Sequence, residues 1–161
     1  MTNIYKGSDF PGDGRLIGVD FGRKRVGFSI SSPDQKYSSP MDNYTRKNEE
    51  ADARKIKQMV EENRAVGIVV GLPVHMSCDE GELAKASREY GQWLNELTSL
   101  PVIYWDERFT SSSADDLLRG ANLSWKKRKS KLDKLAAHLM LQAFLDAPDR
   151  NMKPIDIRED N

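Results

Sequence analysis

Three carboxylates stand in surroundings where an unpaired charge would be costly. Asp20 lies near the end of the apolar run 16–21, Glu107 follows the apolar run 102–105, and Asp133 lies in a helical pattern rich in leucine and alanine. Because burial of an unpaired carboxylate is expensive, Asp20 is expected to have a strong partner such as a metal ion. If the fold brings the three acids together, they form a site for Mg²⁺ (or Mn²⁺) and for metal-assisted phosphodiester hydrolysis.

Each acid also has a basic neighbour that could pair with it in place of a metal, and Asp20 could instead cap the turn at Gly22. These neighbours are Lys24 and Arg25 for Asp20, Arg108 for Glu107, and Lys129 and Lys134 for Asp133. The coincidence of three such acids, with a basic segment between the second and the third, favours a shared site.

That basic segment carries five positive charges within residues 126–131. Cations at the start of a helix oppose its dipole, so the cluster gains nothing from local structure there. Contact with phosphate is therefore favoured over a solvated helix start, and Trp125 could stack on an unpaired base or pack on the loop. The candidate nucleic-acid contacts are Lys24, Arg25, Arg108, Lys126, Lys127, Arg128 and Lys129.

Composition excludes several other classes of protein. The 161 residues contain 25 Lys and Arg and 25 Asp and Glu, so the molecule is no polycation and any nucleic-acid binding must be local. Cys78 is the single cysteine, so no internal disulfide can form, which fits a reducing compartment. The first residues hold no apolar signal core, and the longest apolar run, about 66–74, is shorter than the ~20 residues of a membrane span. We expect a cytoplasmic protein with no membrane contact.

The periodicity of apolar residues predicts an α/β fold. Its centre is a mixed five-stranded sheet with helices on both faces, in which the later strands run parallel to the first. Ala136 and Ala137, one turn after Asp133, would let the last helix approach this sheet closely. We expect strands at 16–21, 25–31, 35–44, 66–71 and 101–105, helices at 48–63, 79–97, 110–118 and 130–146, and a basic loop at 120–129. The expected domain spans residues 14–147, between flexible tails at 1–13 and 148–161.

Four segments, taken in order, resemble the motifs of one family. They are Gly-Val-Asp-Phe-Gly-Arg-Lys-Arg-Val-Gly-Phe-Ser at 18–29, Val-Val-Gly-Leu-Pro at 69–73, Trp-Asp-Glu-Arg-Phe-Thr-Ser at 105–111 and Asp-Lys-Leu-Ala-Ala-His-Leu at 133–139. Together they resemble the YqgF (RuvX) family of RNase H-like nucleases. The resemblance implies an RNase H-like fold and a divalent-metal phosphodiesterase whose catalytic acids and metal ligands are Asp20, Glu107 and Asp133. It also implies a role at the 5′ end of precursor 16S ribosomal RNA, and the family is also named for Holliday-junction resolution.

One loop departs from the family pattern. After Pro73 the family continues with Asn and a small loop containing Gly and Asp, whereas this chain places His75 and Cys78 there. The substitution concerns substrate contacts of the loop rather than the metal site. His75 could act as a general acid or base, while His138 is expected to be a structural residue of the last helix.

Several functions remain open at this point. The first is hydrolysis of structured RNA such as pre-rRNA, and the second is cleavage of a DNA junction, which would normally require a symmetric homodimer rather than a monomer. A non-catalytic nucleic-acid-binding module would gain nothing from acids that repel phosphate. Actin-like nucleotide-binding proteins share a Gly-x-Asp-x-Gly loop but need two lobes, and 161 residues supply one.

Overall fold

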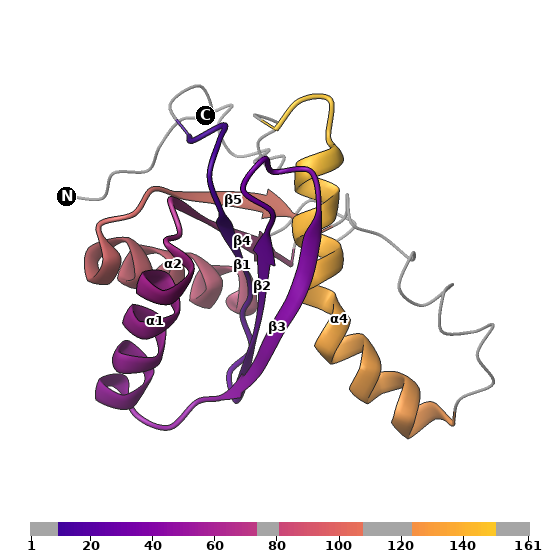
Figure 1. The fold of residues 1–161 in the computed structure, drawn as a ribbon. Helices are drawn as coiled ribbons and strands as arrows, with labels where there is room; N and C mark the ends of the chain where they lie inside the picture. The colour runs from indigo at the N-terminus through magenta and orange to yellow at the C-terminus, as the bar shows by residue number, and fades with distance from the viewer. Residues whose placement is uncertain (1–9, 74–80, 108–123, 151–161) are drawn as a thin grey trace, which may run out of the picture.

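The computed structural model describes residues 10–73, 81–107 and 124–150, with the last helix described by its backbone alone over residues 125–134. Its centre is a five-stranded sheet with the strand order β3-β2-β1-β4-β5 (Figure 1). The strands are β1 (Leu16–Asp20), β2 (Arg25–Ser31), β3 (Ser38–Thr45), β4 (Gly67–Leu72) and β5 (Val102–Asp106).

The sheet is mixed, as expected. β1, β2 and β3 form an antiparallel meander, and β4 and β5 run parallel to β1, with Val19 opposite Val70 and Val70 opposite Tyr104. β1 and β4 are central strands whose apolar runs are buried on both faces, which is why they were readable from the sequence. β3 is an edge strand in which Ser38 alone is buried, and its weak pattern reflects that position.

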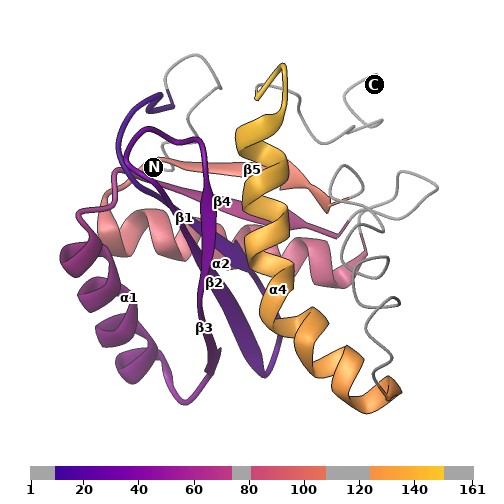
Figure 2. The ribbon, with the colours of Figure 1, turned by 45° about the vertical axis from the view of Figure 1, so that its right-hand side comes forward.

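Helices cover both faces of the sheet. α1 (Glu49–Asn63) and α2 (Glu82–Thr98) pack on one face, and α4 (Trp125–Asp146) packs on the other (Figures 1 and 2). Asn48 caps α1 by accepting a hydrogen bond from the Ala51 amide at 2.8 Å. The α/β architecture predicted for an RNase H-like protein is therefore confirmed.

Each face has its own core. Alternate residues of β1 divide between the two cores, since successive side chains of a strand point to opposite faces. On the α1 and α2 side, Ile17 and Val19 pack with residues such as Ile56 and Leu94. On the α4 side, the core contains Leu16, Val69, Trp105, Met140, Leu141 and Phe144.

The start of the last helix differs from the prediction. α4 begins at Trp125, so residues 126–129 are helical and not a loop. Lysine and arginine are good helix formers, and no Gly or Pro separates them from the leucine-rich part of the helix. The basic residues therefore extend the helix. The expected helix at 110–118 lies outside the described residues.

Residues 1–9 and 151–161 also lie outside the described part of the chain, so the flexible tails stay a prediction. The described segments next to them pack on the domain. Phe10 meets Phe144 edge to face at 6.0 Å, and the Arg150 guanidinium donates to the Gln35 side chain at 2.8 Å. Among the described residues, no helix is long and apolar enough to cross a membrane.

Candidate active site

Two of the three predicted acids meet at one edge of the sheet. Asp20 is the last residue of β1, and Glu107 directly follows the last residue of β5. β1 and β5 both run parallel to β4, so their carboxyl ends lie at the same edge. Asp20 shares the α4 side of β1 with Gly18, because side chains two residues apart on a strand lie on the same face.

The carboxyl groups of Asp20 and Glu107 are hydrogen-bonded to each other. Burial, followed by the charge of Asp20 and the hydrogen bond to it, raises the pKa of Glu107 to about 9. The nearby charge of Asp106 adds to this effect. At neutral pH, Glu107 therefore keeps its proton and donates a hydrogen bond to the Asp20 carboxylate, as expected for two carboxyls sharing a confined site.

Gly71 makes room for the Glu107 side chain. A Cβ atom at Gly71 would lie 2.6 Å from Oε1 of Glu107 and 3.2 Å from Cγ of Met140. Any larger residue would therefore push Glu107 or α4 away. The signal for this role was a glycine inside an otherwise apolar strand, which indicates a close approach by another group.

α4 lies unusually close to the middle of the sheet. A Cβ atom at Gly18 would meet Oγ of Ser29 and would come within 3.0 Å of the Leu141 Cβ. The Ser29 hydroxyl donates a hydrogen bond of 2.8 Å to the Ala137 carbonyl, and Ala137 is fully buried. The expectation that small residues allow a close approach is thus confirmed at Ala137.

Asp133 lies in α4, one helical turn before Ala137. Residues four apart in a helix share a face, so Asp133 belongs to the face of α4 that Ala137 presents to the sheet. Its side chain is outside the described atoms. Among the described residues, no group of three His, Cys, Asp or Glu side chains forms a ready metal site.

The donor chemistry of the described pair fits a hard divalent cation. Asp20 and Glu107 are both half-buried and supply only oxygen atoms, the ligands that Mg²⁺ prefers. The raised pKa of Glu107 shows that two negative charges are costly there without a cation. The two carboxyl groups therefore fit the chemistry of the predicted metal ion.

Asp106 contributes to this site although sequence reasoning did not select it. It ends β5 and is fully buried, and its charge helps to raise the pKa of the adjacent Glu107. A buried acid next to a predicted ligand could have been noticed from the Asp-Glu pair at the end of an apolar strand.

The predicted basic contacts are only partly described. Lys24 and Arg25 are exposed, at the β1–β2 turn and at the first position of β2. Lys126, Lys127, Arg128 and Lys129 occupy the first turns of α4, where only the backbone is described. Arg108, His75 and Cys78 lie outside the described residues.

His138 has a structural environment. Its ring Nδ1 lies 2.9 Å from the Ser38 hydroxyl, which also donates to the His138 carbonyl. Burial lowers the pKa of this imidazole and so favours its neutral form. The contact ties α4 to β3, in line with the structural role expected for this histidine.

Comparison with known proteins identifies relatives over most of the chain. The family model RuvX, described as Holliday junction resolvase, matches residues 14–147. Two relatives share the name "Putative pre-16S rRNA nuclease". The one from Koribacter versatilis is 39% identical over 133 residues, which are 83% of this chain and 87% of the relative. The one from Rhodopirellula baltica is 38% identical over 138 residues, which are 86% of this chain and 80% of the relative.

Among solved structures, Thermus thermophilus RuvC in complex with a Holliday junction substrate has a TM-score of 0.48 and 12% identity, over 81% of this chain and 94% of that one. The family assignment does not depend on this distant likeness. It depends on the family match, which spans the whole sheet and α4, and on the identity to the relatives above. This chain belongs to the RuvX family.

Proposed function

We propose that the protein is a divalent-metal-dependent nuclease that hydrolyses phosphodiester bonds and processes the 5′ end of pre-16S rRNA. The observation that carries the proposal is the hydrogen-bonded pair of Asp20 and Glu107 at the carboxyl edge of the parallel strands. The names of its relatives supply the substrate.

In this proposal Asp20, Glu107 and Asp133 hold Mg²⁺ or Mn²⁺. The bound ion would activate water and stabilise the charge that develops on the phosphate. To hold the ion, Glu107 would first lose the proton of its hydrogen bond to Asp20, because a carboxyl group binds a cation through its ionised form. Asp20, fixed at the end of a central strand, and Gly71, which leaves space for Glu107, hold the two carboxyls in position.

The course of α4 supports the place of Asp133 in this set. Phe144 contacts Phe10, which precedes β1, whereas Ala137 lies over Gly18 within β1, so α4 runs opposite to β1. From Gly18 to Asp20 the strand advances by roughly 6–7 Å. From Ala137 back to Asp133 the helix advances by about 6 Å in the same direction. The backbone therefore carries Asp133 towards the level of Asp20.

The basic residues are proposed to hold the substrate. Lys24 and Arg25 flank the turn next to Asp20, and Lys126 to Lys129 occupy the helix end that leads to Asp133. We assign these residues, together with Arg108, to phosphate contacts beside the scissile bond. For a ribosomal precursor, the corresponding compartment is the cytoplasm.

Cleavage of a DNA junction is the second candidate, because the family model carries that description. Paired cuts at a four-way junction need two active sites, so this function requires a homodimer, whereas cleavage of one RNA strand needs only a monomer. Measurement of the mass of the protein in solution, alone and with substrate, therefore helps to distinguish DNA-junction cleavage from RNA cleavage.

The test is a cleavage assay with Mg²⁺, with Mn²⁺ and with excess chelator. The substrates are a pre-16S rRNA fragment containing the 5′ leader, an RNA duplex and a four-way DNA junction, with the Asp20→Asn protein as control. We expect cleavage of the rRNA fragment that disappears with chelator. Cutting of the junction alone would replace RNA by DNA as the substrate, and undiminished activity in chelator would refute the metal mechanism.

A further inference from the structure

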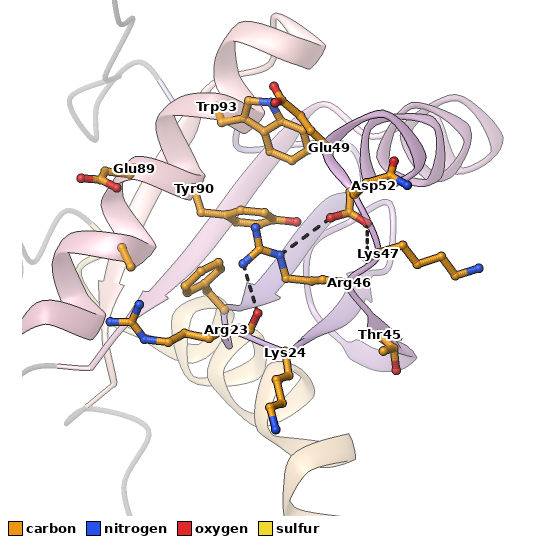
Figure 3. A pocket seen from close by; sticks show the side chains of 13 residues that line it. Arg23, Lys24, Thr45, Arg46, Lys47, Glu49, Asp52, Glu89, Tyr90 and Trp93 are labelled. Carbon is orange, nitrogen blue, oxygen red and sulfur yellow. Dashed lines mark hydrogen bonds and ion pairs between the residues drawn. The ribbon is translucent and has the colours of Figure 1, made fainter.

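A pocket of about 870 Å³ opens on the face of the sheet opposite α4 (Figure 3). Its walls come from the β1–β2 turn, the connection between β3 and α1, and α2. The volume lies within the range of sites for small ligands, roughly 300–1,000 Å³. Among the described residues, neither Asp20 nor Glu107 lines it.

Aromatic rings form one side of the pocket. The rings of Phe21 and Tyr90 lie 4.8 Å apart, and those of Tyr90 and Trp93 lie 5.3 Å apart. The Arg46 guanidinium lies 5.2 Å from the centre of the Phe21 ring and 5.6 Å from that of Tyr90. Tyr90 is buried, while Phe21 and Trp93 keep part of their surface accessible. Such surfaces bind flat, unpaired bases by stacking.

Asp52, the buried acid in the pocket wall, has partners within the protein. Asp52 accepts hydrogen bonds from the Tyr44 hydroxyl at 2.8 Å and from the Lys47 amide at 3.0 Å. It also lies 3.8 Å from Nε of Arg46. The ion pair with Asp52 helps to hold the Arg46 guanidinium beside the rings (Figure 3), and the other two contacts fix the carboxylate of Asp52.

Exposed charges of both signs line the mouth. Lys24 and Lys47 extend outwards from it, and Glu49 and Glu89 lie on the helical side (Figure 3). Lysines can bind a phosphate group, and carboxylates can accept hydrogen bonds from the amino group of a base. A nucleotide matches this combination, because it offers a phosphate, a flat ring and amino donors. An acidic protein segment would leave the aromatic rings unused.

The pocket and the proposed active site lie on opposite faces of the same end of β1. Phe21 follows Asp20 in the chain, so their Cα atoms are about 3.8 Å apart. Phe21 packs with the core on the α1 and α2 side, whereas Asp20 belongs to the α4 side of the sheet. A nucleic-acid strand that crosses the β1–β2 turn would thus reach the carboxyl pair and the pocket within a few nucleotides.

We propose that this pocket binds one unpaired nucleotide of the substrate strand, with its base stacked on Trp93 and its phosphate held by Lys24 and Lys47. The inference rests on the proposed nuclease function and deepens it, because it assigns recognition of a single-stranded segment next to the cleaved bond. It can be tested without cleavage, through binding in the presence of chelator.

The experiment compares binding of a labelled single-stranded RNA of about 12 nucleotides with that of an RNA duplex of the same length, by fluorescence anisotropy. Stacking on one base corresponds to a loss of about 5- to 150-fold, so Trp93→Leu should weaken single-strand binding within that range and leave duplex binding unchanged. Lys47→Ala should weaken single-strand binding and reduce the slope of log K against log salt by about 0.7. Lys57→Ala, an exposed lysine of α1 outside the pocket, is the matched control and should change neither.

Far-UV circular dichroism checks that Trp93→Leu is folded, and the exposed Lys47 supplies an independent test if it is not. Equal losses for single strand and duplex, or no loss in either variant, would overturn the proposal. A poly-glutamate peptide that displaces RNA equally well from the wild type and from Trp93→Leu would also overturn it, in favour of an acidic protein segment.

The two proposals fail separately. Loss of single-strand binding in Trp93→Leu, in a protein that cleaves nothing with either metal, would support the pocket and refute the nuclease function. Metal-dependent cleavage together with unchanged binding in both pocket variants would support the nuclease function and refute the pocket.

Discussion

The pair of Asp20 and Glu107 shows how a functional site can oppose stability at the level of single residues. Two half-buried carboxyls in contact cannot both ionise cheaply, so one of them keeps a proton. When both groups are ionised the interaction is unfavourable, and it becomes favourable when a proton or a cation lies between the oxygens. Strain of this kind is typical of sites that bind metal ions.

The shared proton makes stability depend on pH. In the unfolded chain Glu107 titrates near 4.5, and in the folded protein its pKa is about 9. Between these values the folded state binds more protons, so the free energy of unfolding should fall as pH rises from about 5 to about 9. The slope from this group is at most about 1.4 kcal/mol per pH unit. Urea denaturation of chelator-treated protein across this range measures it, and Glu107→Gln should remove this contribution. Identical pH profiles for both proteins would contradict the assignment.

Asp20→Asn should separate activity from folding. The change removes one negative charge beside Glu107, so we expect cleavage to be abolished while the free energy of unfolding at pH 8 stays equal or rises by about 1 kcal/mol. Mg²⁺ at 100 times its Kd should stabilise the wild type by about 2.7 kcal/mol and the variant much less. Thermal denaturation with and without Mg²⁺ measures both effects. A variant that is active, or is stabilised by Mg²⁺ like the wild type, would rule out Asp20 as a ligand.

At the scale of elements, two glycines in central strands set how closely α4 and the Glu107 side chain approach the sheet. Gly18 lets α4 settle on β1, and Gly71 lets Glu107 lie across β4. In both strands a glycine replaces a side chain that would otherwise add to the core. The loss of apolar burial is offset by the close approach of the groups that form the site.

Gly71→Ala tests this role. Its Cβ would lie 2.6 Å from Oε1 of Glu107, so we expect the carboxyl to be displaced, with a large loss of cleavage and a loss of stability of about 1–3 kcal/mol. Gly12→Ala is the matched control, because a Cβ at Gly12 meets nothing within 4 Å. Cleavage rates and urea denaturation of the two variants give the comparison. Wild-type activity in Gly71→Ala would show that the position of Glu107 is not critical.

At the scale of the whole molecule, zero net charge conceals an uneven distribution. Lys126 to Lys129 are consecutive, while the acidic residues of the first turn of α1 lie on the opposite face of the sheet. A neutral protein can therefore bind a polyanion through one region, and this binding should depend strongly on salt.

Replacement of Lys126, Lys127, Arg128 and Lys129 by Gln should weaken binding of nucleic acid and flatten its salt dependence. Each lost phosphate contact lowers the slope of log K against log salt by about 0.7–0.9. The control is the double change Lys57→Gln and Arg64→Gln, two exposed residues on and just after α1. Anisotropy titrations at several salt concentrations measure the slopes. Equal slopes in all three proteins would show that the start of α4 does not touch nucleic acid.

The sequence by itself determined the strand and helix order, the mixed sheet and the family, because apolar periodicity and short motifs are local properties of the chain. It also singled out Asp20 and Glu107, since a carboxylate beside a buried strand is costly wherever the strand lies. The predicted start of α4 was wrong, because a run of lysines considered by itself is compatible with a loop or with a helix.

Only the tertiary structure decided which groups meet. It placed Asp20 against Glu107 and fitted Glu107 over Gly71. It also assembled Phe21, Arg46 and Trp93 into a pocket from a turn, a connection and a helix. These contacts join residues far apart in the chain, and they depend on strand order, register and helix position, which no single segment specifies. A local pattern can show that a charge needs a partner, but the packing of the sheet and its helices selects the partner.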